Sequence, residues 1–217
     1  MRRSLLVAAG TALLCLTPVA ALAATAAPKP APATVHTVVR PVNTHGHAVQ
    51  GWVVDAPGNG SPLDCSGPYA SVAAVDKNIL QCAPDAAYAV ACWPAARAHH
   101  VLCLDDARSH QLVKLRTKGR IAHPKPLKHR APLQLTLANG VHCGIRDGGA
   151  ATNLKQHPSW LVTYYCTHNR AVWVSPQRTD FGVHRGGPAW TVDVANANGK
   201  HDIHTQRVTR AWFVGTA

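Results

Sequence analysis

The sequence predicts a mainly β fold made of two small disulfide-stapled antiparallel β subdomains, sandwich- or barrel-like, with little helix apart from an N-terminal signal peptide. Turn-forming residues recur at short intervals from Gly51 onwards, and the runs between them are rich in Val, Leu, Ile, Thr, Trp and Tyr. Short runs of this kind, bounded by Gly, Pro and Asn, are typical of strands joined by turns. An even set of cysteines in the same part of the chain adds the expectation of disulfide bonds.

The N-terminus has the layout of a secretory signal peptide. A pair of arginines precedes an apolar run over residues 5–16, and Ala21 and Ala23 stand at the −3 and −1 positions of a cleavage site. This layout predicts a signal peptide over residues 1–23 and a secreted or cell-envelope location. No second apolar run is long enough for a transmembrane helix, so none is expected after cleavage.

The cysteines are expected to be paired. Cleavage of the signal peptide removes Cys15 and leaves an even number, which in an exported chain is typical of disulfide bonds. We predict that each cysteine pairs with its neighbour along the chain. The expected pairs are Cys65–Cys82, Cys92–Cys103 and Cys143–Cys166.

Composition divides the rest of the chain into four segments. Residues 24–50 are rich in Ala and Pro and poor in large apolar side chains, which predicts a disordered stalk. Residues 117–131 are basic and rich in Pro, which predicts a linker. On either side of this linker we expect an N-terminal β subdomain over residues 51–116 and a C-terminal β subdomain over residues 132–217.

Two hairpins stand out in the second half. Their turns are expected at Asn139-Gly140 and His168-Asn169, and Asn-Gly tolerates the positive φ angles that a tight hairpin requires. Trp160 and Trp173 fall in the two strands of the second hairpin and are expected to pack together. Residues 71–80 contain enough alanine for a short helix instead of a strand. The expected strands cover residues 88–93, 101–104, 111–115, 133–137, 141–145, 160–166, 171–174, 189–194 and 208–214.

The charge balance is strongly basic. The chain has 22 Lys and Arg against 10 Asp and Glu, a formal net charge of +12, and it contains no glutamate. Such a balance favours contact with an anionic surface, and solubility alone is the alternative explanation. The partners that fit are an anionic envelope polymer or a protein partner, with nucleic acid less favoured.

One basic segment is the strongest local feature. Its first three basic residues are spaced by two, so a strand would place them on one face, where they could follow a polyanion. The alternative is an ordinary solvated linker. No aromatic residues are interleaved, so the segment does not support base stacking of the kind used for single-stranded nucleic acid. The candidate polyanion-binding residues are Lys114, Arg116, Lys118, Arg120, Lys125, Lys128 and Arg130.

No motif assigns a catalytic, cofactor-binding or metal-binding residue. Gly-x-Ser-x-Gly is absent, and no pair of aspartates is recognisable as a glycosidase pair. Two alternatives are kept because the chain has 14 histidines: a small secreted hydrolase such as a nuclease, and a histidine-based metal binder. The histidines that lie near one another in sequence are His45 and His47, His99 and His100, and His201 and His204.

Several short motifs occur in a recognisable order. They are Cys-Ala-Pro to Ala-Cys-Trp-Pro over residues 82–94, Leu-Thr-Leu-Ala-Asn-Gly-Val-His-Cys over 135–143, Tyr-Tyr-Cys over 164–166, Pro-Ala-Trp-Thr-Val over 188–192 and a terminal Ala-Trp-Phe. With the signal, the stalk and the basic linker, this order resembles a group of uncharacterised secreted proteins of mycobacteria and related actinobacteria. The resemblance implies an exported location and no particular activity. The sequence therefore predicts a non-enzymatic exported protein that binds an anionic envelope polymer or partner.

Overall fold

The structure is a computed structural model. It describes residues 30–55, 61–67, 69–84, 89–146, 148, 154–200 and 202–217. The expected signal peptide over residues 1–23 lies outside them. The described residues contain strands and turns but no helix, so a short helix over residues 71–80 is not formed. Accordingly, none of them belongs to a helix long and apolar enough to cross a membrane.

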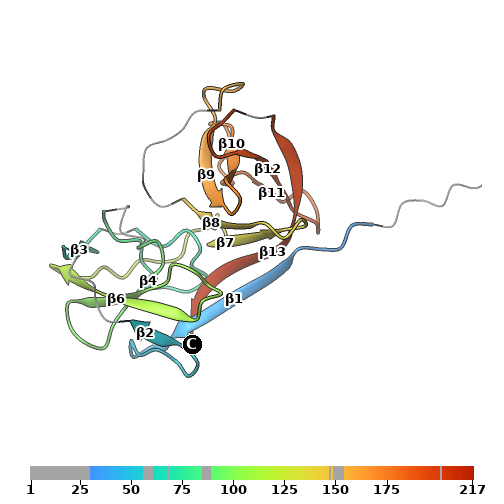
Figure 1. The fold of residues 1–217 in the computed structure, drawn as a ribbon. Helices are drawn as coiled ribbons and strands as arrows, with labels where there is room; N and C mark the ends of the chain where they lie inside the picture. Colours follow the sequence, from blue (N-terminus) through green and yellow to red (C-terminus); the bar gives the residue numbers. More distant parts are fainter. Residues whose placement is uncertain are drawn as a thin grey trace, which may run out of the picture. The chain divides into compact units, whose positions relative to one another are not determined.

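Six antiparallel strands close into a barrel (Figure 1). They are β7 (Gln134–Leu137), β8 (His142–Ile145), β9 (Leu161–Cys166), β10 (Arg170–Val174), β12 (Thr191–Asn196) and β13 (His204–Thr216). Each strand pairs with the next, and β13 returns to β7 with Ala211 opposite Leu135. The short strand β11 (Val183–His184) pairs with β12. The mainly β fold class is thus confirmed.

Both expected hairpins form. Gly140 has a φ of 79°, and His168 and Asn169 have φ angles of 59° and 53°. The two consecutive positive φ angles of His168 and Asn169 are those that a type I′ turn requires. Such turns are common in hairpins because their twist matches that of the flanking strands. The chain therefore turns where the local sequence predicts, between β7 and β8 and between β9 and β10.

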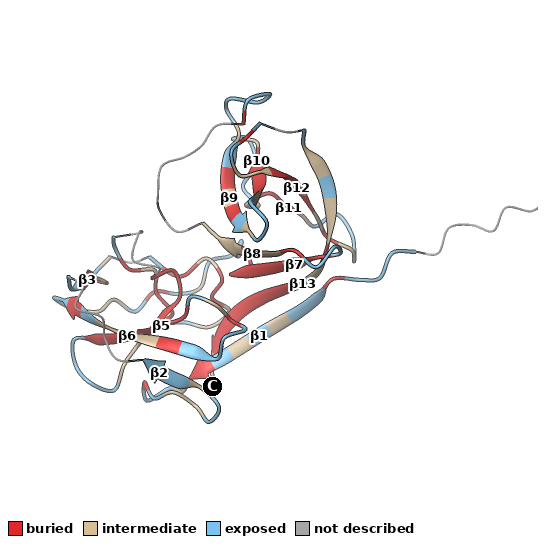
Figure 2. Cartoon of the chain, viewed as in Figure 1, coloured by how far each residue is buried: buried red, intermediate tan, exposed pale blue. Residues whose placement is uncertain are grey.

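The two faces of the barrel wall carry different clusters. The interior is filled by apolar side chains such as Leu135, Tyr164 and Val172, so it is a packed core. Trp173 lies next to Val172 on β10 and faces the other side, where it belongs to a second cluster, against which Trp160 packs as expected. A register shift between β9 and β10 pairs Trp173 with Val162, which belongs to the same second cluster. Figure 2 shows the buried stretches of the barrel strands, such as β7 and β10, in red.

A second, mixed sheet is built from the first half of the chain. It contains β2 (Val53–Asp55), β3 (Leu63–Asp64), β4 (Cys92–Pro94), β5 (His100–Cys103) and β6 (Gln111–Lys118). Strands β4, β5 and β6 are antiparallel neighbours, whereas β2 and β3 pair with β6 in parallel. Parallel pairs need long connections, which is why local turn signals did not indicate them.

All three predicted disulfides are present. Cys92 and Cys103 are direct partners across β4 and β5, and Cys143 and Cys166 are direct partners across β8 and β9. The third bond joins Cys65 and Cys82. Neighbouring strands thus bring neighbouring cysteines together, and the three bonds indicate an oxidising, extracytoplasmic environment.

The two sheets share a hydrophobic core, so the expected subdomains over residues 51–116 and 132–217 do not pack independently. One cluster combines Leu102 and Leu112 of the second sheet with Trp212 of β13. Residues 31–217 accordingly form one compact unit. The physical reason is size, because a small sheet buries more apolar surface by sharing a core than by forming its own.

The basic segment over residues 117–131 is a fixed strap and not a linker. The backbone N–H of Ala122 donates to the carbonyl of Cys65 at 2.9 Å, and the N–H of Asn78 donates to that of Pro124 at 2.9 Å. The N–H of Ala131 donates to the carbonyl of Val72, also at 2.9 Å. Proline restricts the backbone, but the remaining amides still bind the second sheet and its loops.

The expected stalk over residues 24–50 is also corrected, because β1 (Val35–Val42) lies within it. This strand pairs in parallel with β13, with Thr37 opposite Trp212 (Figure 1). Its side chains are mostly exposed or half-buried, as an edge strand allows (Figure 2), but Val42 is fully buried. Few large apolar residues are needed here, because backbone hydrogen bonds to β13 supply most of the attachment.

Thr34 joins β1 to the barrel. Its hydroxyl donates to the carbonyl of Val208 at 2.7 Å and accepts the backbone N–H of Trp190 at 2.8 Å. Its own N–H donates to the carbonyl of Pro188 at 2.8 Å, and the residue is buried. A single threonine therefore satisfies backbone groups of two barrel segments.

We expect Thr34→Val to lower the free energy of unfolding by about 2 kcal/mol, because valine has the same shape but leaves a buried N–H and a buried carbonyl without their partner. Urea denaturation would measure the change. The matched control is Thr37→Val, three residues further along and half-buried on β1, for which we expect little change. Equal stability of the Thr34→Val variant and the wild-type protein would contradict the role given to this hydroxyl.

Candidate functional site

The structure separates the predicted polyanion-binding residues into two places. Lys114, Arg116 and Lys118 alternate along β6 as expected, and Arg116 and Lys118 are exposed. The ammonium group of Lys118 lies 3.7 Å from the carboxylate of Asp64. These residues form a solvated basic row on the second sheet, where each charge is worth little by itself.

Lys128 and Arg130, at the end of the strap, line a hollow of about 480 Å³ beside β1 and β13. We call it the arginine hollow. Arg120 and Lys125 are exposed and do not line it, and neither do the basic residues of β6. The lining residues are His36, Val38, Val75, Lys128, His129, Arg130, Thr179, Asp180, Val183, Arg185, Trp190 and Phe213.

Arg185 is the central cation of this hollow. Its Nη2 donates to the backbone carbonyl of Arg130 at 2.8 Å, and its Cζ lies 4.5 Å from the centre of the Trp190 ring. The His36 ring centre lies 4.3 Å from that of Trp190. Trp190 is buried, and its backbone N–H donates to the hydroxyl of Thr34. Its ring therefore gives Arg185 a fixed surface to lie against.

The charges in the hollow are unbalanced. Surrounding protein partly excludes water from Arg185, which lowers its pKa. Tyr164 and the carboxylate of Asp180 oppose this effect, whereas the positive charge of Arg130 adds to it, and the net shift is downward. Arg185 nevertheless stays charged at neutral pH, as arginine does in proteins. Two guanidinium groups that repel each other in this way form a site where an anion would relieve the repulsion.

Asp180 is the only acid in the lining of the arginine hollow, and it already has partners. Its Oδ1 accepts the Nε–H of Arg178 at 3.1 Å and the backbone N–H of Gly182 at 3.1 Å, and its Oδ2 pairs with Nη2 of Arg178. Burial raises the pKa of Asp180, but the contacts with Arg178 outweigh it and the net shift is downward. This carboxylate is therefore shared between Arg178, which it binds directly, and Arg185, whose pKa its negative charge raises.

Sequence reasoning missed His36, Arg185 and Trp190. His36 fell in the expected stalk, and Arg185 stands alone before a Gly-Gly-Pro turn with no other arginine or lysine close by. Their common site arises because β1 pairs with β13 and because the strap ends beside the loop between β11 and β12. No short-range pattern carries that information.

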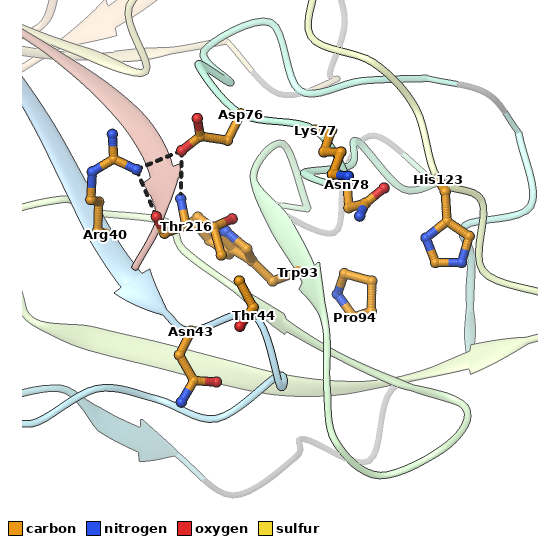
Figure 3. A pocket seen from close by; sticks show the side chains of 10 residues that line it. All are labelled: Arg40, Asn43, Thr44, Asp76, Lys77, Asn78, Trp93, Pro94, His123 and Thr216. Atoms are coloured by element: carbon orange, nitrogen blue, oxygen red, sulfur yellow. Dashed lines mark hydrogen bonds and ion pairs between the residues drawn. The ribbon is translucent and has the colours of Figure 1, made fainter.

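A second hollow of about 610 Å³ lies next to the other end of β1 (Figure 3). We call it the Arg40–Asp76 hollow. Nη1 of Arg40 lies 2.5 Å from Oδ2 of Asp76 and donates to the carbonyl of Thr216 at 2.6 Å, while the Thr216 N–H donates to Asp76 at 2.9 Å. Burial raises the pKa of Asp76, but these hydrogen bonds outweigh it and the pKa is lowered.

Two glycines permit close contacts beside this second hollow. A Cβ at Gly215 would lie 2.6 Å from Nη1 of Arg40 and 2.8 Å from Oδ2 of Asp76. A Cβ at Gly46, which has a φ of 77°, would lie 2.5 Å from the backbone nitrogen of Ala96. The ion pair and the turn after β1 therefore approach their neighbours as closely as they do only because these side chains are absent.

The two alternatives based on histidine, a metal binder and a small secreted hydrolase, depend on the histidine side chains that the structure describes. Within the described residues no three His, Cys, Asp or Glu side chains converge as metal ligands, and His201 lies outside those residues. The ring of His100 is turned towards the carbonyl of Ala98, with Nδ1 at 2.8 Å. Thr136 Oγ1 lies 3.0 Å from His142 Nδ1 beside a hollow of only about 170 Å³, and burial lowers the pKa of His142.

No family model matches the chain, and neither a curated protein nor a solved structure matches it. The resemblance to secreted actinobacterial proteins stays a prediction of the sequence. The site must therefore be interpreted from its own chemistry.

Proposed function

We propose that this chain is an exported binding protein without catalytic activity, and that it holds an anionic polymer of the cell envelope at the arginine hollow. The observation that carries the proposal is that Arg185, bound to the backbone carbonyl of Arg130, lines one hollow with Arg130 and Lys128, where the only lining acid is already bound by Arg178. Three positive charges face a single lining carboxylate, and this excess of positive charge makes an anionic ligand favourable.

Arginine suits this role because its planar guanidinium binds carboxylate or phosphate groups through two parallel hydrogen bonds. Arg185 is held in advance by the Trp190 ring and the carbonyl of Arg130, so little side-chain freedom is lost on binding. The basic row of Lys114, Arg116 and Lys118 on β6 adds a weaker, salt-sensitive attraction for a long polymer.

The proposal is tested by removing charge from the hollow while keeping polar side chains there. We expect Arg130→Gln/Arg185→Gln to weaken binding to linear polyphosphate at least tenfold and to reduce the salt dependence of that binding. Fluorescence titration of the oxidised protein at 50 to 200 mM salt would measure both. The matched control is Arg97→Gln/Lys155→Gln, which removes the same number of charges from exposed positions outside both hollows.

Equal losses in the two double variants would show that only net charge matters, which would contradict a site at the arginine hollow. A triple variant, Lys114→Gln/Arg116→Gln/Lys118→Gln, measures the contribution of β6 separately. For it we expect a smaller loss, about threefold, that vanishes at high salt, because exposed charges are screened within about 8 Å at physiological ionic strength.

A further inference from the structure

The two hollows lie next to each other along β1. His36 and Val38 line the arginine hollow, and Arg40 lines the other. Alternate residues of a strand share a face, so these three side chains form one row that spans roughly 13 Å. The opposite wall is also shared, because Val75 lines the first hollow and Asp76 the second.

Electrostatics also connects the hollows. The positive charge of Arg130, in the arginine hollow, helps to lower the pKa of Asp76, in the other. The wall between them is held by the β13 backbone, since the N–H of Val75 donates to the carbonyl of Val214 at 2.8 Å. A chain-like ligand bound at Arg130 could therefore continue into the Arg40–Asp76 hollow over a rigid surface.

The second hollow differs from the first in chemistry. Figure 3 shows Arg40, Asp76 and Thr216 on one side of it and Asn78, Pro94 and His123 on the other. A carboxylate, a guanidinium, an amide, an imidazole and the hydroxyl of Thr44 together offer acceptors as well as donors. Hydroxyl groups match such a mixture because each can donate and accept, whereas a phosphate would face the carboxylate of Asp76.

We propose that the two hollows form one track for an acidic polysaccharide, with a carboxylate or other acidic group of one sugar on Arg130 and Arg185 and the hydroxyl groups of the next unit in the Arg40–Asp76 hollow. This inference rests on the proposed function and names its ligand class. Base stacking does not fit the track, because the rings of Trp93, Trp190 and Phe213 are 2%, 8% and 8% exposed.

The experiment compares ligands that carry similar charge but differ in hydroxyl groups. Isothermal titration at 150 mM salt would use hexamers of galacturonate and of mannuronate, the methyl esters of both, and linear hexaphosphate. We expect at least one of the two acidic hexamers to bind about tenfold more tightly than hexaphosphate and than its own methyl ester. Weaker binding of both acidic hexamers than of hexaphosphate would overturn the inference in favour of a phosphate polymer or nucleic acid.

A variant of the second hollow separates the two proposals. Thr44→Val/Asn78→Gly removes a hydroxyl and an amide, and glycine at position 78 accepts the positive φ of 63° that Asn78 has. We expect about a tenfold loss of acidic-hexamer binding and no change with hexaphosphate, as two lost hydrogen bonds imply. An unchanged thermal midpoint confirms that the variant is folded.

The outcomes can be told apart. If Arg130→Gln/Arg185→Gln loses all ligands while Thr44→Val/Asn78→Gly binds the acidic hexamer like wild type, the saccharide track is wrong and the anion site stands. If Arg130→Gln/Arg185→Gln binds hexaphosphate like wild type, the proposed function itself is wrong. Saturation-transfer NMR on the wild-type protein gives a check without any variant, because protons of more than one sugar unit should receive saturation only if the second hollow is also occupied.

Discussion

Replacing Trp173 by alanine is expected to lower the free energy of unfolding by about 4 kcal/mol. Trp173 is completely buried, and it packs in one cluster with Leu154 and Val162. Alanine removes the contacts of the whole indole and leaves a cavity that the disulfide-stapled barrel wall cannot fully close. Its indole N–H has no hydrogen-bond partner, so almost the entire loss comes from packing.

Urea denaturation of the oxidised protein, followed by circular dichroism, would measure this loss. Leu161→Ala is the matched control, because Leu161 lies on the adjacent strand but is 42% exposed. For it we expect a loss well below 1 kcal/mol. If the two substitutions had similar effects, the cluster on the outer face of β9 and β10 would not be the core that its burial indicates.

The second large effect is expected from Cys143→Ser/Cys166→Ser. The bond closes a loop with a sequence separation of 23 residues, and in the chain-entropy description its loss costs about 3 kcal/mol. The two cysteines are direct partners between β8 and β9, and both β8 and β9 belong to the closed barrel. Serine keeps the size close to that of cysteine, so the change acts chiefly on the freedom of the unfolded chain.

The same measurement on Cys92→Ser/Cys103→Ser provides the comparison. Its loop has a sequence separation of 11, so we expect a loss smaller by about half a kcal/mol. In the polyphosphate titration we expect the larger loss of binding for Cys143→Ser/Cys166→Ser, because this bond joins two strands of the barrel, to which β13 beside the arginine hollow also belongs. An unchanged unfolding midpoint after loss of the Cys143–Cys166 bond would contradict its stabilising role.

The barrel explains why the candidate site can be rigid while its ligand-binding residues lie in loops. Arg185 follows β11, Trp190 precedes β12, and both positions are held because β12 pairs with β13. Thr34 then attaches β1 to the same place through Val208 and Trp190. A rigid scaffold that presents cations from loops is a common way to place binding residues.

The sequence by itself determined the local features. The turn at Asn139-Gly140 follows from the positive φ that Gly140 adopts, and Leu135 and Leu137 of β7 follow from the buried inner face of the barrel. The disulfide pairs were predictable because each joins cysteines that are close along the chain and that hairpins or loops bring together. Charge patterning likewise located the basic row of β6 on one face.

Only the tertiary structure decided which distant segments meet. Val35 and Arg210 are paired in parallel between β1 and β13, yet a parallel pair has no connecting turn to announce it, so the first of these strands looked like a stalk. Arg130 and Arg185 come together for the same reason, since each is an ordinary exposed arginine in its own segment. Local propensity acts over a few residues, whereas the site is made by contacts between residues far apart in sequence, and these exist only once the shared core has formed.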